Sequence, residues 1–69
     1  MKLNYSGIRA EMARRGVNQQ DLAKMLGVHY NTINNWVWGR HDPGLGNVLE
    51  LLRAIGMSDD EILSMELRE

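Results

Sequence analysis

Residues 18–39 read NQQDLAKMLGVHYNTINNWVWG and carry the clearest structural signals in the chain. Asn18 is of a residue type that caps helix N-termini, and Asp21, three residues later, gives a partial capping box. Gly27 ends the helix that follows, because glycine takes the left-handed conformation at a helix C-terminus at little cost. After a very short connection, a further helix is predicted over residues 29–38. The stretch therefore predicts two short helices joined by a tight turn.

Helix signals continue on both sides of this stretch. One helix is predicted over residues 5–15, ended by Gly16, and another over residues 45–55, ended by Gly56. Residues 58–61, SDDE, are a full capping-box signature for a fifth helix. No segment alternates polar and apolar residues with period two, as a half-buried strand does. The sequence therefore predicts an all-helical chain.

Apolar residues recur on one face of each longer helix. Helices this short are marginal in isolation, so burial of these faces in one shared core must stabilise them. The predicted core contains Ile8, Met12, Leu22, Leu26, Val28, Ile33, Trp36, Val37, Val48, Leu49, Leu52 and Ile55. Residues 1–69 are expected to form a single small domain, because a chain of 69 residues is near the lower limit for a self-sufficient core.

Composition argues against several classes of protein. The chain has no cysteine, and therefore no disulfide, thiolate zinc site or thiol nucleophile. No apolar run approaches the roughly 18 residues of a membrane span, and the N-terminal MKLNYSG lacks the apolar core of a signal peptide. His29 and His41 lack the spacing and companions of metal ligands, and the acids at 59–61 suit a helix start rather than a catalytic site. We expect a cytoplasmic protein that is no enzyme and needs no metal or cofactor.

The charges divide the chain into two halves. Residues 1–40 carry six Lys and Arg side chains against two carboxylates, a balance of +4, whereas residues 41–69 carry two against seven, a balance of −5. The whole chain has a net charge of −1. This asymmetry fits one half that faces a polyanion and another that is turned away from it. Ordinary solvated charge is the alternative interpretation.

The helix over residues 29–38 has two different faces. Projected at about 100° per residue, the apolar Ile33, Trp36 and Val37 share one side. The other side carries Asn31, Asn34, Asn35 and Trp38. Asparagine is a poor helix former, but its amide can pair bidentately with the N6/N7 edge of adenine in the DNA major groove. This helix is therefore a candidate for reading DNA, with a merely solvated face as the alternative.

The residue types at fixed positions within residues 18–39 indicate a particular family more specifically than the two faces of the helix do. A polar cap and a glutamine are followed by Leu-Ala, Leu-Gly-Val, an isoleucine and a closing glycine, at Asn18, Gln19, Leu22, Ala23, Leu26, Gly27, Val28, Ile33 and Gly39. The segment resembles the Cro and phage-repressor type of helix-turn-helix, also called the xenobiotic-response-element family. The resemblance covers residues 8–63, through Pro43, Leu45, LLRAIG and the Ser58 cap. It implies a five-helix, lambda-repressor-like domain and a phage or bacterial transcription regulator that binds a double-stranded DNA operator.

The resemblance also implies roles for individual residues. Base edges are expected to be read by Tyr30, Asn31 and Asn35, with Asn34 and His29 close enough to contribute. Phosphate contacts are expected from Gln19, Asn18, Arg40, His41 and Asn47. Gln19 is also expected to brace the recognition helix, and His29 to cap it.

Four positions depart from the family pattern. Asp42 places a carboxylate in a loop where the family commonly has a basic or neutral residue. Met12 and Val37 occupy two positions where the family often pairs an arginine with a glutamate, and the joint change to apolar residues is compatible with an intact core. Glu11 stands where the family usually has leucine, and the sequence does not explain it.

An apolar strip near the C-terminus is expected to be buried in part against the chain's own core, and its remainder predicts a weak homodimer contact. Its residues are Met57, Ile62, Met65 and Leu67. Trp38 is expected to cover the Gly39 loop and to pack on a partner chain rather than to contact DNA.

A second class of function remains open. The same scaffold could serve as a protein-interaction module, an antirepressor or antitoxin that binds another regulator through its acidic C-terminal half. Asp42 and the net negative charge favour this alternative, whereas the asparagine-rich face favours DNA binding.

Overall fold

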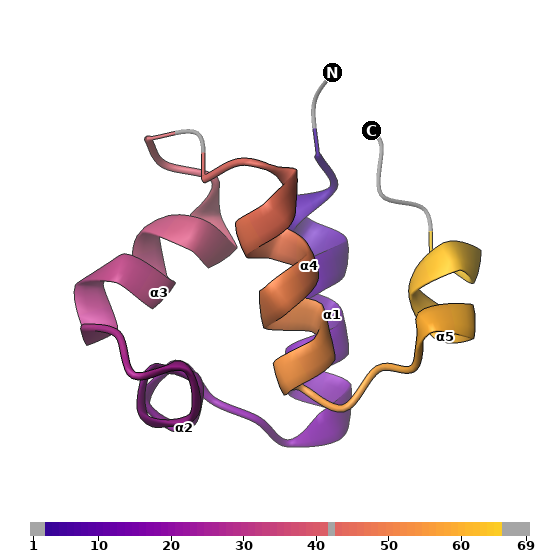
Figure 1. Ribbon diagram of the computed structural model, residues 1–69, viewed down its shortest axis with the longest axis horizontal. Coiled ribbons are helices and arrows are strands. Elements are labelled where there is room, and N and C mark those ends of the chain that lie inside the picture. The colour runs from indigo at the N-terminus through magenta and orange to yellow at the C-terminus, as the bar shows by residue number, and fades with distance from the viewer. Residues whose placement is uncertain (1–2, 42, 66–69) are drawn as a thin grey trace.

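A computed structural model describes residues 3–41 and 43–65 of the chain. Its five helices are α1 (Tyr5–Arg15), α2 (Gln19–Leu26), α3 (Tyr30–Trp38), α4 (Leu45–Ala54) and α5 (Asp59–Ser64). Figure 1 shows α4 crossing in front of α1, with α2 and α3 on one side of this pair and α5 on the other. The five-helix, all-helical architecture predicted from the sequence is confirmed for the described residues. Within the described part, no helix has the length and apolar character needed to span a membrane.

The predicted caps form. The Asn18 side chain accepts from the backbone N–H of Asp21 at 2.8 Å, and the Asp21 carboxylate accepts from the Asn18 N–H at 3.3 Å, so the capping box of α2 is complete. Ser58 and Glu61 form the same reciprocal box at α5. His29 caps α3 through Nδ1, which accepts from a backbone N–H, and α3 begins one residue later than predicted, at Tyr30.

Gly39 closes α3 for two physical reasons. Its φ of 71° lies in the left-handed region, which most residues with a Cβ avoid. A Cβ at this position would also lie 2.5 Å from Cε2 of Tyr5, at the start of α1. The end of α3 is thereby brought against the start of α1.

The core is assembled from all five helices and the segments next to them. Its buried apolar residues are Leu3, Ile8, Met12, Leu22, Ala23, Ile33, Val37, Val48, Leu51, Leu52, Ile55, Met57 and Ile62. Trp36, predicted as core, is only half-buried at its edge, as are Leu26, Val28 and Leu49. Leu51, which the prediction omitted, is 1% exposed. The difference arises because α4 packs against both α2 and α5, so a wider face of α4 is buried.

Packing of α5 corrects part of the predicted dimer contact. Met57 and Ile62 are each 5% exposed and belong to the core of the monomer, so they do not form the surface strip that was predicted. Met65 is half-buried against the same core, and Leu67 lies outside the described residues. Leu63, which was not predicted, is 83% exposed.

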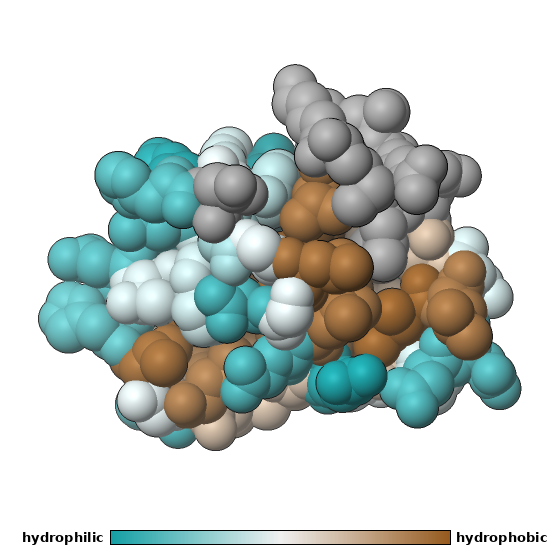
Figure 2. All heavy atoms as spheres, turned by 45° about the horizontal axis from the view of Figure 1, so that its top comes forward, coloured by the Kyte–Doolittle hydropathy of each residue, from teal (hydrophilic) through white to brown (hydrophobic). Residues whose placement is uncertain are grey.

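Hydrophilic and hydrophobic side chains separate on the surface. Figure 2 shows hydrophilic side chains gathered at the edge formed by α3, and hydrophobic ones nearer α4 and α5. The edge that carries α3 is therefore the polar side of the molecule on this face.

Candidate nucleic-acid interface

Helices α2 and α3 form a steeply crossed pair. Figure 1 shows α2 end-on below α3, which runs across the view. Ile33 and Val37 of α3 are completely buried, and Leu22 of α2 is buried with them. Because these residues anchor the inner face of α3, its opposite face points away from the core.

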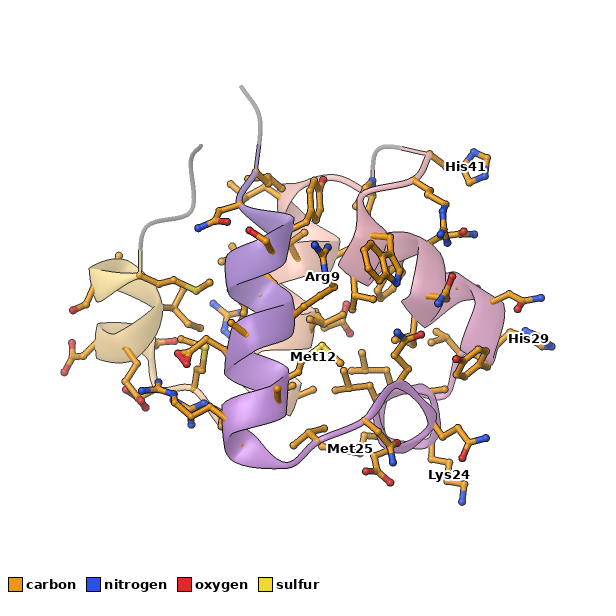
Figure 3. All side chains as sticks on the ribbon, turned by 180° about the vertical axis from the view of Figure 1, so that it is seen from behind. Arg9, Met12, Lys24, Met25, His29 and His41 are labelled. Carbon is orange, nitrogen blue, oxygen red and sulfur yellow. The ribbon has the colours of Figure 1, made fainter. Side chains whose placement is uncertain are left out.

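The predicted base-reading residues are not equally exposed. Asn31 and His29 are exposed, and Tyr30 is 43% exposed, at the N-terminal end of α3. Asn35 is half-buried one turn further along. Figure 3 shows His29 pointing away from the molecule at the outer edge of α3. The N-terminal end of α3 is thus its most accessible part.

Asn34 differs from the other asparagines because both ends of its amide are bonded within the chain. Its Nδ2 donates to Oε1 of Gln19 at 2.9 Å, across the α2–α3 junction. Its Oδ1 accepts from Nη1 of Arg40, in the loop that follows α3. The expected bracing of α3 by Gln19 therefore has a specific partner, which the sequence did not identify.

The remaining predicted phosphate contacts lie at the start of α2, in the loop after α3 and on α4. A hollow of about 330 Å³ between the N-terminal ends of α2 and α3 is lined by Asn18, Gln19, Gln20 and Tyr30. His41 is exposed at a φ of 60° in the loop after α3, whose next residue, Asp42, lies outside the described residues. Asn47 of α4 donates through Nδ2 to the Pro43 carbonyl oxygen at 2.7 Å.

A comparison with known protein families agrees with the helical arrangement described above. A family model described as helix-turn-helix, of the Cro and repressor type, matches residues 8–62. The chain belongs to this helix-turn-helix family. No curated protein and no solved structure matches the chain significantly. The protein is accordingly a DNA-binding regulator of the helix-turn-helix type.

This helix-turn-helix protein links α1 to the end of α3 through residues that the sequence did not single out as a pair. Arg9 of α1 donates through Nη1 to the Val37 carbonyl oxygen at 2.8 Å, and its guanidinium carbon lies 3.9 Å from the centroid of the Trp38 ring. The Arg40 guanidinium lies 5.9 Å from the same centroid. Trp38 is 49% exposed, and Figure 3 shows Arg9 reaching from α1 toward α3. The predicted role of Trp38 is thus incomplete, because its ring packs against two cations of its own chain.

Ion pairs sort the basic residues of the helix-turn-helix domain into two groups. Arg14 pairs with Glu11, so the carboxylate that departs from the family pattern has a partner on its own helix. Arg15 pairs with Glu61 at 2.6 Å and Arg53 with Asp59 at 3.6 Å, so acids of α5 neutralise cations of α1 and α4. Among residues 3–41 and 43–65, Arg9, Lys24 and Arg40 form no ion pair.

The cations without ion pairs lie on or beside the α2–α3 side. Figure 3 shows Lys24 at the outer edge of α2 and Arg9 reaching from α1 toward α3, and Arg40 lies in the loop after α3, where it donates to Asn34. The charge asymmetry along the sequence thus corresponds to an arrangement in space. Of the described residues, the unpaired cations lie on or beside α2 and α3, whereas the acids of α5 pair with cations of α1 and α4. The described part of the chain contains no group of three or more His, Cys, Asp or Glu residues that could hold a metal ion.

Proposed function

We propose that the protein is a sequence-specific regulator of transcription that places α3 in the major groove of double-stranded DNA. The observation that carries this proposal is the division of α3. Ile33 and Val37 are fully buried, while Tyr30 and Asn31 are exposed beside the N-terminus of α2. Recognition helices of this class direct their N-terminal residues at base edges.

The exposed side chains suit particular contacts with bases. Asn31 presents an amide that can bond bidentately to adenine, and Asn35 lies one turn further along the same helix. Tyr30 and His29 lie at the start of α3, where they can reach flanking bases. These four residues are the base-reading set that we propose.

Phosphate contacts would fix the orientation of α3. The reading helix is flanked by Asn18 and Gln19 at the start of α2 and by Arg40 and His41 after its own C-terminus. Phosphate contacts from such residues fix the position of the protein along the DNA without carrying sequence information. The N-terminus of α4 has no side-chain cap on its N–H groups, so it can also receive a phosphate. The Asn47 side chain is hydrogen-bonded to the Pro43 carbonyl oxygen, so its role would be to hold the N-terminal end of α4 in place.

Two copies of the protein would contact more base pairs than a single recognition helix can. A single recognition helix covers only a few base pairs, so we propose a weak homodimer on half-sites about 34 Å apart, one turn of the double helix. With Met57 and Ile62 buried, the described apolar residues available for such a contact are the exposed Leu63 of α5 and the half-buried Met65 that follows this helix.

One observation favours the second candidate, a protein-interaction module. A hollow of about 370 Å³ between α1 and α5 is lined by Glu11, Arg14, Met57, Asp60, Glu61, Ser64 and Met65. This mixed acidic and apolar surface suits a protein partner better than DNA, because carboxylates repel phosphates.

Salt-dependent binding separates the two functions. Affinity for random duplex DNA is measured by fluorescence anisotropy over a range of salt concentrations. Each phosphate contact of a true DNA binder contributes about −0.9 to the slope of log K against log [salt]. A steep negative slope, followed by enrichment of one sequence from a random duplex pool, supports the regulator. A flat slope without enrichment supports the protein-interaction module.

A further inference from the structure

We propose that Gln19 and Arg40 form a single binding site for the DNA backbone, and that Asn34 is the positioning residue that holds them together and reads no base. The inference rests on the proposed DNA-binding function and deepens it. It replaces the base-reading role that the sequence suggested for Asn34 with a different one.

The geometry of the Asn34 amide carries the inference. Its nitrogen donates to Gln19 Oε1 at 2.9 Å, and its oxygen accepts from Arg40 Nη1. Bidentate reading of adenine needs the oxygen and the nitrogen of one amide together. Both atoms of Asn34 already have partners, and the bond from Arg40 is charge-assisted and therefore strong. Reading a base would require Asn34 to weaken or give up these contacts.

The two partners keep the donors that a phosphate needs. Gln19 uses its amide oxygen toward Asn34, which leaves the Nε2 hydrogens for an acceptor. Arg40 uses Nη1, which leaves most of its five N–H donors. Because both side chains bond to one amide, they lie within reach of one phosphate or of two neighbouring phosphates on one strand.

Charge and restraint support the same assignment. Arg40 forms no ion pair with any carboxylate that the structure describes, and its guanidinium also lies 5.9 Å from the Trp38 ring centroid. A long side chain held at two points loses less freedom when it binds a phosphate, so preorganisation strengthens binding. Asn34 thus prepares the site before DNA arrives.

The test compares Asn34→Ala with Asn31→Ala, which removes an exposed amide on the same helix. Duplexes selected by the parent protein and scrambled duplexes are titrated against each variant. For Asn34→Ala we expect both affinities to fall by a similar factor of about ten, with the ratio between them unchanged. Loss of preference at one base pair, with random-DNA affinity intact, would show that Asn34 reads a base and would overturn the proposal.

A double-mutant cycle tests the coupling without relying on the Asn34→Ala protein. Gln19→Ala, Arg40→Met and the double variant are titrated against random duplex DNA. We expect the double variant to lose less than the product of the two single losses, because the two side chains act as one site. Independent, multiplicative losses would contradict the single site.

The same measurements separate this inference from the proposed function. If the parent protein selects no sequence and shows a flat salt slope, the DNA-binding proposal itself fails. If the parent binds a selected site but the cycle shows independent losses, only the shared site fails.

Discussion

The guanidinium of Arg9 lies against the ring of Trp38, 3.9 Å from its centroid, and donates to the carbonyl oxygen of Val37 at 2.8 Å. A cation beside the last turn of a helix interacts favourably with its carbonyl end, and the aromatic face adds a cation–π contact. Members of the family often join the same two helices by an arginine–glutamate pair, at positions that here carry Met12 and Val37. Both are buried, so the polar link between α1 and α3 has moved from the core to the edge.

Removal of this link should destabilise the fold. Arg9→Ala is expected to lower the free energy of unfolding by about 1–3 kcal/mol, because it removes a charge-assisted hydrogen bond and a stacked cation. Arg14→Ala is the matched control on the same helix; the Arg14 side chain is 69% exposed, so the loss of its pair with Glu11 should cost at most about 0.5 kcal/mol. Urea unfolding followed by circular dichroism measures both. Equal losses of unfolding free energy in the two variants would show that the contacts of Arg9 do not stabilise the fold.

Restoring charges inside the core should show whether positions 12 and 37 meet. Met12 and Val37 are 6% and 0% exposed. Met12→Arg alone should cost about 3–5 kcal/mol, because it leaves an unpaired buried charge. Adding Val37→Glu should recover part of that loss through mutual attraction. A double variant no more stable than the sum of the single effects predicts would exclude contact between the two side chains.

Substitutions on the exposed face of α3 should affect DNA binding and leave the fold intact. Asn31→Ala and Asn35→Ala should each weaken specific binding by about 1–3 kcal/mol and barely change binding to random DNA. Gln19→Ala should instead weaken both, because a phosphate contact carries no sequence information. Titration against selected and scrambled duplexes distinguishes these patterns. If both asparagine variants bind the selected site like the parent, the amides are a solvated face.

Acid should weaken the attachment of α5 through Glu61. The backbone N–H of Ser58, together with Arg15, lowers the pKa of the Glu61 carboxyl from 4.5 to about 2. Because the folded pKa lies below the unfolded one, this stabilisation is present above pH 4.5 and is lost as the pH falls toward 2. Glu61→Gln should therefore reduce the change in unfolding free energy across this window. Asp60→Asn, one residue earlier, should leave the contribution of Glu61 in place, and identical pH profiles for Glu61→Gln and the parent would contradict the assignment.

The helices and their ends follow from local sequence. The capping boxes at Asn18 and Ser58 and the glycines after α1, α2 and α3 act over three to five residues, so local geometry decides them without the rest of the chain. The period of the apolar residues likewise placed Ile33 and Val37 inside and Asn31 outside.

The contacts between side chains of different helices depend instead on how the helices pack in three dimensions. Burial of Leu51, Met57 and Ile62 depends on which helices pack around α4 and α5, and their own sequence period does not specify this. The contacts of Arg9 with Trp38 and of Asn34 with Gln19 join residues on different helices. A long polar side chain can reach many neighbours, so its partner is fixed by the crossing of the helices that carry the pair.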